Sequence, residues 1–517
     1  MNAPFPTLSR TGPRVAIIGA GPGGLASAML LAAQGARVTV FERDAVVGGR
    51  SRTLATPEGY RFDSGPTFFL YPRILREIFA ACGAELDDEI DLIRLDPQYR
   101  LVFEGATPLT IDATPDLDRM EAEIAKLSPA DAAGLRRFMT DNRAKLAAFR
   151  PVLERPFQGL ADYLAPAVLK GLRYLRPWAS VNDDLKRHFT DPRTRLAFTF
   201  QSKYLGMSPF RCPSLFSILS FLEYEHGIFH PRGGCGAVSA AMARVAGRLG
   251  VDIRLDSPVD RIAFEGNRAV GVEVAGRRHD ADAVVVNADF AHAIPRLMPD
   301  ALRPQWTDAK IAKARYSCST FMLYLGIEGA LPDLAHHTVL LAEDYERNLR
   351  QIEAGEIPDN PSIYVQAAAG TDPSLAPAGH ATLYVLVPVP NLIGGADWTV
   401  EAPRFRRLAL DRLKALGLHD IESRIRYERI VTPRDWRDDF AVGHGATFNL
   451  AHDMRQMLHF RPRNRFGKAT GVYLVGGGTH PGSGLPVIYE GARISARLLM
   501  RDLGMAPMAG ATAALRG

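Results

Sequence analysis

The chain has 517 residues, of which 47% are hydrophobic, and its formal net charge is +5. This size and composition are typical of a folded protein with a large core and two or three subdomains, and they exclude disorder throughout the chain. Lys and Arg are scattered rather than gathered in runs, and no nucleic-acid-binding motif is present, so we exclude nucleic acid as a partner.

The four cysteines lie far apart and form no C-x-x-C pair; they are Cys82, Cys212, Cys235 and Cys318. This spacing predicts no metal site, no iron–sulfur cluster and no disulfide framework, and it favours a reducing cytosolic compartment. The N-terminus lacks an apolar signal core, and the apolar stretch 15–31 is interrupted by four glycines and a proline. We therefore expect no transmembrane span.

The first motif combines a strand, a glycine turn and a helix. Residues 15–18 are apolar and mostly β-branched, and Gly19, Gly21 and Gly24 follow in G-x-G-x-x-G spacing. A helix is expected over 25–34 and a second strand over 38–41, which ends at Glu42. The glycines allow a tight turn, close approach of pyrophosphate and close helix packing, while the glutamate can accept hydrogen bonds from a ribose 2′-OH. The complete unit predicts a dinucleotide site.

The residues after this unit favour FAD over NAD. Gly48, Gly49 and Arg50 place a flexible turn and a fixed cation beside the same phosphates, where an Arg can hold two oxygens. The segment FDSGPT follows, and Gly65 and Pro66 within it mark a loop that continues into Thr67.

Further along the chain, residues 81–228 are expected to be mainly helical, with two helices over 116–146 that separate at Ser128-Pro129. Next come a glycine-rich turn, a helix over 237–249 and strands at 252–255, 258–264, 269–274 and 283–286. Residues 300–465 mix strand patterns, such as 321–327 and 381–387, with helices. Near the C-terminus, a strand at 472–475 leads through the glycine turn 476–478 into a helix from about Pro486.

These patterns predict an α/β protein with a discontinuous Rossmann-like FAD-binding domain and a mixed α+β substrate domain. The FAD-binding parts are 1–80, 229–299 and 466–505. A helical, membrane-facing part covers 81–228, the substrate domain with a mixed sheet covers 300–465, and 506–517 is a disordered tail.

Several segments in the same order resemble bacterial carotenoid desaturases of the phytoene-desaturase type, within the flavoprotein superfamily that also contains amine oxidases. The most specific are FDSGPT (62–67), PRGG (231–234) and GGGTHPGSGLP (476–486). Weaker ones are LAHHTV (334–339), DWTVEAP (397–403) and FRPRNR (460–465). The resemblance covers nearly the whole chain.

The resemblance implies an FAD-dependent enzyme that removes hydrogen from a long, apolar isoprenoid and introduces conjugated double bonds, with oxygen or a membrane quinone as electron acceptor. It also implies that the Val259 segment meets the adenine. The flavin pocket is then closed by the C-terminal segment that contains Gly477, Gly478, Pro486 and Val487. The enzyme is expected to be peripheral at the cytoplasmic face of the cell membrane, and homo-oligomers are compatible with this expectation.

The chain departs from the family pattern after Pro486, where Tyr489 and Glu490 replace smaller or apolar residues. This leaves the substrate open between phytoene, a C30 analogue such as diapophytoene, and oxidation of a terminal methyl group. A saturase or an isomerase could use the same scaffold. A flavin amine oxidase or a Rab-escort-like chaperone of prenylated proteins is disfavoured by the desaturase-like segments and the complete flavin motifs.

Three residues are candidates for catalysis. Asp191 and Arg195 lie four apart, on one face of a helix that begins at Asp191 or Pro192, and could handle protons; the alternative is an N-cap aspartate paired with an arginine. His480 lies in the flavin-closing turn, where it could meet the isoalloxazine or bond nearby backbone. His336 and His337 face opposite ways on a strand, and we favour structural roles for both.

Residues 156–181 mix large apolar residues with Lys170, Arg173 and Arg176. Such a basic, amphipathic segment can lie in a membrane interface, where an insoluble substrate is collected. The alternative is a helix that covers the substrate core with a solvated basic edge. Pro166 and Pro177 are expected to keep any helix here short.

Overall fold

The computed structural model describes residues 11–105, 108–172, 174, 176, 178–331 and 333–507. Arg173, Pro177 and most of the predicted disordered tail lie outside these residues. No helix in the described part of the chain is both long enough and apolar enough to cross a membrane.

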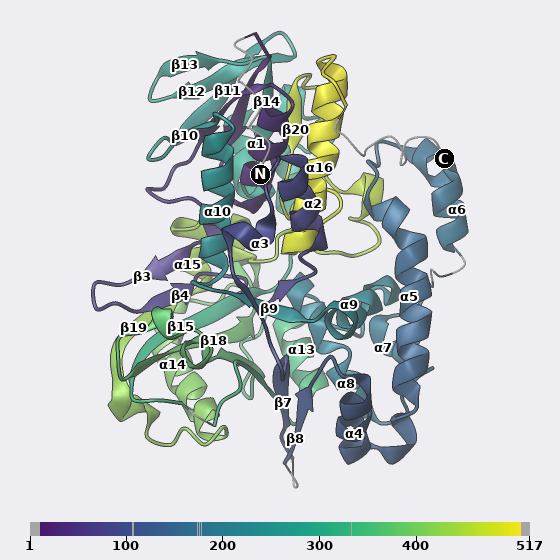
Figure 1. The fold of residues 1–517 in the computed structure, drawn as a ribbon, viewed down its shortest axis with the longest axis vertical. Helices are drawn as coiled ribbons and strands as arrows, with labels where there is room; N and C mark the ends of the chain where they lie inside the picture. The colour runs from purple at the N-terminus through teal and green to yellow at the C-terminus, as the bar shows by residue number, and fades with distance from the viewer. Residues whose placement is uncertain are drawn as a thin grey trace.

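A five-stranded parallel sheet is assembled from three distant parts of the chain (top of Figure 1). Its strands, in spatial order, are β10 (Asp252–Arg254), β2 (Arg37–Phe41), β1 (Arg14–Ile18), β14 (Ala283–Val286) and β20 (Val472–Leu474). The strands predicted at these places are confirmed. Because the strands are short, apolar and β-branched, both faces of the sheet need covering.

One face of this sheet packs against helices in a large apolar cluster. These helices are α1 (Pro22–Ala33), α2 (Arg73–Ala81), α10 (Cys235–Arg248) and α16 (Leu485–Asp502). The other face packs against a small antiparallel sheet and α11 (Phe290–Leu297). That small sheet consists of β11 (Val259–Glu265), β12 (Arg268–Val274) and β13 (Arg277–Asp280).

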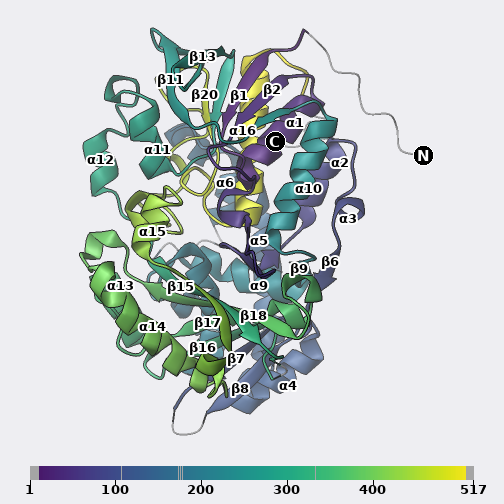
Figure 2. The same cartoon turned by 90° about the vertical axis from the view of Figure 1, so that its left-hand side faces the viewer.

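A second, seven-stranded sheet lies below the five-stranded sheet in Figures 1 and 2. In spatial order it contains β19 (Ile425–Val431), β15 (Ser319–Glu328), β18 (His380–Val389), β17 (Ile363–Gln366), β16 (His337–Leu341), β7 (Tyr99–Phe103) and β8 (Leu109–Ala113). All neighbours are antiparallel except β16 and β7. α14 (Trp398–Lys414) packs on one face through Trp398 and Phe405.

Most of residues 81–228 is helical, yet this part also supplies strands, which the sequence analysis did not expect. β7 and β8 extend the seven-stranded sheet, and β6 (Leu92–Arg94) pairs with β9 (Ile228–Pro231). The helices are α3 (Leu86–Glu89), α4 (Leu117–Leu127), α5 (Gly134–Leu153), α6 (Pro166–Leu172), α7 (Val181–Leu185), α8 (Pro192–Ala197) and α9 (Ile218–His226). The predicted separation at Ser128-Pro129 is confirmed, because α4 ends at Leu127.

The remaining elements connect these layers. β3 (Thr53–Ala55) pairs with β4 (Arg61–Asp63), and β5 (Phe69–Leu70) pairs with β9. The other helices are α12 (Asp308–Lys313), α13 (Tyr345–Ala354) and α15 (Pro433–Asp438). The strand–loop segment from β4 to β5 therefore runs between the two sheets, and it carries the FDSGPT motif.

Candidate active site

Three neighbouring parallel strands, β1, β14 and β20, end side by side. Gly19 follows β1, Asn287 follows β14, and Gly476 comes two residues after the end of β20. Gly19 has φ +96°, and a Cβ there would lie 2.7 Å from the Asn287 carbonyl oxygen. A Cβ on Gly24 would lie 2.0 Å from the Gly19 carbonyl oxygen, and one on Gly21 would lie 3.0 Å from the Asn287 amide nitrogen. Only glycine allows this backbone approach, so the G-x-G-x-x-G turn is packed as a nucleotide-binding turn requires.

Glu42 lies directly against this turn. Its Oε2 accepts a hydrogen bond from the Ala20 N–H at 2.6 Å, and its Oε1 accepts one from the Asp44 N–H at 3.0 Å. Burial of the side chain raises the pKa of Glu42. The Ser257 N–H donates to the Glu42 carbonyl oxygen at 2.7 Å, which brings the half-buried Val259 at the start of β11 to the same end of the sheet.

Arg50 and the FDSGPT loop form a second wall beside the glycine turn. The Ser64 hydroxyl donates to the Arg50 carbonyl oxygen at 2.8 Å, and a Cβ on Gly65 would lie 2.5 Å from that same oxygen. Pro66 and Thr67 continue the loop between β4 and β5. The structure thus brings Arg50 and Gly65 together across a gap of 15 residues in sequence.

Asp63 anchors this wall to the PRGG turn. It is buried, and its Oδ1 accepts a hydrogen bond from the Cys235 N–H at 2.7 Å, at the N-terminus of α10. Burial raises the pKa of Asp63 to about 7, although backbone donors oppose that effect. The FDSGPT and PRGG motifs are more than 160 residues apart in sequence, and this hydrogen bond brings them side by side in the structure.

The C-terminal glycine turn connects β20 with α16. The Gly477 carbonyl oxygen accepts a hydrogen bond from Arg461 at 2.6 Å, and a Cβ on Gly478 would lie 2.6 Å from the Phe290 Cβ. Pro486 and Val487 occupy the first turn of α16, whose N-terminus carries a partial positive charge. Arg461 was missed as a site residue, although the FRPRNR motif contains it.

His480 is buried in this turn, and burial lowers its pKa to about 4, so the imidazole is neutral at physiological pH. Its Nε2 is 3.0 Å from the Arg155 carbonyl oxygen, and its ring packs against Phe157 at 5.4 Å between centroids. Its Nδ1 has no hydrogen-bond partner among the described residues. His480 therefore connects the C-terminal turn with the segment that follows α5.

Asp191 lies at the N-cap of α8, where the sequence analysis placed a helix start. Its side chain accepts hydrogen bonds from the Arg193 and Thr194 N–H groups and forms an ion pair with Arg193 at 3.2 Å. Arg195 instead donates to the carbonyl oxygens of Phe189 and Thr190. The N-cap alternative is confirmed, and the paired arginine is Arg193 rather than Arg195, because the N-cap geometry turns the carboxylate towards the first helical turn.

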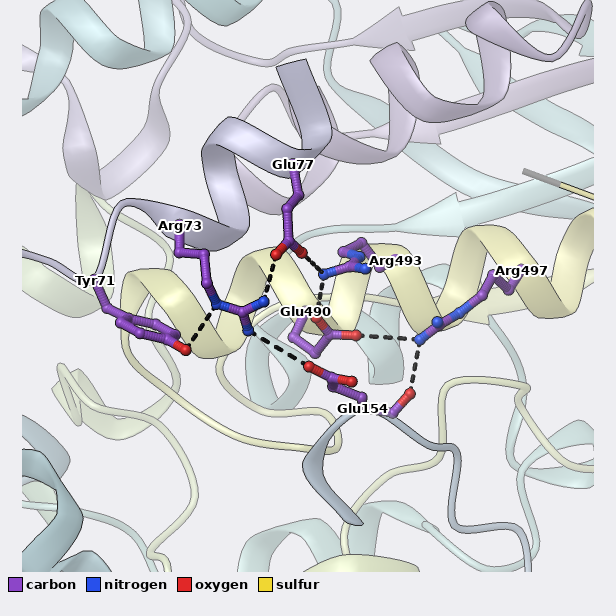
Figure 3. Close-up of polar contacts among 7 residues, drawn as sticks. All are labelled: Tyr71, Arg73, Glu77, Glu154, Glu490, Arg493 and Arg497. Atoms are coloured by element: carbon purple, nitrogen blue, oxygen red, sulfur yellow. Dashed lines mark hydrogen bonds and ion pairs between the residues drawn. The ribbon is translucent and has the colours of Figure 1, made fainter. Parts of the chain in front are cut away.

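Glu490 belongs to an ion network between α16, α2 and the end of α5 (Figure 3). Its carboxylate contacts Arg493 at 3.0 Å and Arg497 at 3.1 Å, and Arg497 also donates to the Glu154 carbonyl oxygen at 2.7 Å. Burial raises the pKa of Glu490 to about 7, although the two arginines oppose this. The network continues through Tyr71, Arg73 and Glu77.

Tyr489 is buried in the apolar cluster that covers the five-stranded sheet. Helical geometry therefore turns Tyr489 into the core and Glu490 into the ion network. Both side chains are explained by these contacts, so the departure from the family pattern at these positions carries no information about substrate length.

A buried acid that the sequence analysis missed lies in α9. Glu223 is fully buried; its Oε2 accepts a hydrogen bond from Gln201 at 2.8 Å, and its Oε1 has no partner among the described residues. Burial raises the pKa of Glu223 to about 8. Phe68, one residue after the FDSGPT loop, lies against Tyr204 and Tyr99, which surround this acid. No sequence motif marks Glu223, because its neighbours come from three distant segments.

His336 and His337 are both buried within polar contacts, which agrees with structural roles. The expectation that they face opposite ways on a strand is wrong, because His336 precedes β16 and the two rings are 4.4 Å apart. The His336 Nδ1 is 2.8 Å from the Thr371 hydroxyl, and the His337 Nδ1 is 2.7 Å from the Tyr364 hydroxyl. Burial lowers the pKa of both histidines, so both are neutral at physiological pH. Among the described residues, no group of three or more His, Cys, Asp or Glu side chains is arranged to hold a metal ion.

Parallel strands whose carboxyl ends carry glycine turns beside a buried glutamate define the class of dinucleotide-binding proteins. The sequence pattern of the flavin containing amine oxidoreductase family matches residues 22–500. The chain belongs to this family, binds FAD and is an oxidoreductase.

Individual relatives match nearly the full length of the chain. A 4,4′-diapophytoene desaturase (4,4′-diapolycopene-forming) of Methylomonas sp is 43% identical over 488 residues, which is 94% of each protein. An all-trans-zeta-carotene desaturase of Myxococcus xanthus is 43% identical over 504 residues, 96% of this chain and 95% of the relative. A solved oxidoreductase from Methanosarcina mazei shares the fold with a TM-score of 0.62 at 19% identity, over 93% of this chain and 99% of its own.

Proposed function

We propose that the protein is an FAD-dependent carotenoid desaturase, which introduces conjugated double bonds into a long polyene precursor such as phytoene or diapophytoene. The observation that carries this proposal is the end-to-end match, at 43% identity, to relatives named for desaturation of such polyenes. A saturase, an isomerase or an oxidase of terminal methyl groups could use the same fold, and the test below separates these alternatives by their products.

The residues at this end of the sheet fit FAD, because three glycines leave room where a Cβ would collide, and the N-terminus of α1 directly follows the glycine turn and can hold phosphate. We assign the pyrophosphate to the α1 turn with Gly19, Gly21 and Gly24, and the ribose to Glu42. Further contacts are assigned to the phosphate-side Arg50, to the adenine-side Val259 and to the flavin-side residues Gly65, Pro66, Thr67, Gly477, Gly478, Pro486 and Val487.

When bound, FAD supplies a hydride acceptor. The chain must then accept the proton that leaves the neighbouring carbon. We assign this proton to Glu223, a buried acid whose Oε1 is unpartnered among the described residues. Its neighbours Tyr99 and Tyr204 pack against Phe68, the residue that follows the FDSGPT loop. Its pKa of about 8 implies that activity rises with pH towards that value, and the Glu223→Gln variant is expected to lose both turnover and this dependence.

Asp191, Arg195 and His480 remain alternative candidates for proton handling. The unpartnered Nδ1 of the neutral His480 can accept a proton, whereas Asp191 and Arg195 are engaged in the local contacts of α8. Each of the three residues is replaced in turn by an uncharged residue of similar size that cannot accept or donate the proton, and turnover is measured in the same assay. The comparison shows whether any of these variants matches the effect of Glu223→Gln.

The function is tested by expression in three hosts, which accumulate phytoene, diapophytoene or zeta-carotene, followed by chromatography of the pigments. A desaturase extends the conjugated system of at least one precursor. A shorter chromophore indicates a saturase, an unchanged number of double bonds with altered geometry indicates an isomerase, and an added oxygen indicates a methyl oxidase. Consumption of oxygen, or of an added quinone, identifies the electron acceptor. Absence of any new product in all three hosts overturns the proposal.

We also propose that the protein docks peripherally on the cytoplasmic face of the membrane through an apolar docking patch. The patch consists of Leu160, Leu164, Leu169, Trp178 and Phe460, whose side chains are 50–83% exposed. Tyr163 joins the two chain segments of the patch, since its hydroxyl is 2.8 Å from the His459 Nδ1. Four of these residues lie within residues 160–178, and large exposed apolar residues are typical of a membrane or protein contact. The exposed Lys170 lies in α6 beside them and favours anionic lipid.

Docking is tested by flotation with vesicles that contain anionic lipid. The double variant Leu164→Glu/Trp178→Glu is expected to stay in the soluble fraction, because each carboxylate opposes entry into an apolar phase. Val400→Glu is the matched control, since Val400 is 68% exposed in α14, outside the patch. Equal flotation of the double variant and the parent protein would exclude this patch as the docking site.

A further inference from the structure

Three tyrosines form a row across the centre of the seven-stranded sheet, one on each of three adjacent strands. Tyr324 lies on β15, Tyr384 on β18 and Tyr364 on β17. Tyr324 and Tyr384 are directly opposite in the β15–β18 register, and their rings are 5.5 Å apart. The Tyr364 and Tyr384 rings are 5.8 Å apart. Side chains on one face of neighbouring strands lie this close, so the three hydroxyls reach one region together.

All three hydroxyls contact the same loop. Tyr324 donates to the Ser64 carbonyl oxygen at 2.7 Å, and Tyr384 donates to the Gly65 carbonyl oxygen at 2.8 Å. The Tyr364 hydroxyl is 2.7 Å from the Thr67 hydroxyl. Burial raises the pKa of each tyrosine, which keeps all three protonated. The row therefore holds one loop by three hydrogen bonds, at three positions within four residues.

The opposite side of this loop rests on the nucleotide-binding part. The Ser64 N–H donates to the Arg52 carbonyl oxygen at 3.0 Å, and the Ser64 hydroxyl donates to that of Arg50. The loop is thus fixed on one side to the turn that we assign to FAD and on the other side to the substrate sheet. A phenylalanine at each position of the row would fill about the same volume. The hydroxyls contribute the three loop contacts and, for Tyr364, one further contact of 2.7 Å with the His337 Nδ1 on β16.

We propose that Tyr324, Tyr384 and Tyr364 are positioning residues, which fix the Ser64–Thr67 loop against the flavin and thereby set the distance between the substrate sheet and the reacting ring. This positioning role refines the proposed function. It requires that FAD binds beside the loop, and it does not depend on the identity of the polyene. Transfer of hydrogen to a flavin requires the reacting atoms to be closely aligned, and a displacement of about 1 Å can cost about a hundredfold in rate.

The test compares the parent with Tyr324→Phe/Tyr364→Phe/Tyr384→Phe. The matched control is Tyr427→Phe. Tyr427 lies on β19, stacks on Phe62 at 5.9 Å, and its hydroxyl forms no hydrogen bond in the described part of the chain. The measured quantities are the dissociation constant of FAD from the apoprotein, the visible absorption spectrum and reduction potential of the bound flavin, and the thermal unfolding of the apoprotein.

The triple variant is expected to bind FAD at least about tenfold more weakly, because two buried loop carbonyls lose their donors, and to shift the flavin spectrum and potential beyond the control. If the row has only a structural role, the triple variant will show a lower unfolding temperature of the apoprotein but an unchanged dissociation constant, spectrum and potential of the flavin. That result would overturn the proposal. If the triple variant does not fold, the three single variants are judged by the same criterion. Normal flavin properties with no pigment formed would count against the proposed function alone.

Discussion

Replacement of Glu223 by Gln changes the pH dependence of stability in a way that the structure predicts in sign and size. Burial raises the pKa of Glu223 from its ordinary value near 4.5 to about 8. Between these values the folded protein holds a proton that the unfolded chain releases, so the stability contributed by this group falls as pH rises. The slope approaches about 1.4 kcal/mol per pH unit, which gives about 5 kcal/mol over the whole interval as an upper bound.

The Gln side chain keeps the shape and the contact with Gln201 but cannot ionise. Urea unfolding of both proteins at about pH 5.5 and pH 7.5 should show that the variant gains about 3 kcal/mol relative to the parent at the higher pH. Asp63 and Glu490, whose pKa values are also raised, are present in both proteins and cancel in this difference. Stability curves that run parallel between the two pH values would refute a neutral Glu223 in the folded state.

Three further substitutions test other parts of the site. In Gly24→Val the new Cβ would lie 2.0 Å from the Gly19 carbonyl oxygen, which is a steric clash in the glycine turn. We therefore expect a protein that purifies without flavin absorbance. Glu490→Ala removes the acid between two arginines, one of them the largely buried Arg497, and should cost about 2 kcal/mol of unfolding free energy in urea titrations. Asp191→Asn retains an N-cap acceptor, so stability should stay within about 0.5 kcal/mol; lower turnover at unchanged stability would establish catalysis by Asp191.

The parallel sheet was predictable because its determinants are local. A β-branched run followed by G-x-G-x-x-G and a later acid strongly indicates a strand–turn–helix–strand unit, because each glycine meets a backbone requirement within that same unit. The separated strands at 252–254, 283–286 and 472–474 were recognisable by their apolar runs and the glycine or polar residues after them. The β7–β8 hairpin was missed, and its place in the seven-stranded sheet could not be predicted locally, because β7 pairs with β16, more than 200 residues away.

The chemical surroundings of the site could not be predicted in the same way. Glu223 occurs in an ordinary helical sequence, and only its neighbours from β7 and the segment before α9 show that it is a buried acid. Glu490 provides the opposite case: its departure from the family pattern after the flavin turn left the substrate open, whereas the structure places its side chain in the ion network. The direction of a side chain depends on the packing of the whole element.

The sequence by itself determined the nucleotide-binding unit, the cofactor class and the family resemblance, because these rest on short segments whose backbone chemistry is encoded within a few residues. Tertiary structure alone decided which acid is kept neutral, which histidines are satisfied and which hydroxyls hold the FDSGPT loop. Burial and hydrogen bonding between separate elements, from about 20 to more than 300 residues apart in sequence, set those properties, and no local pattern carries them.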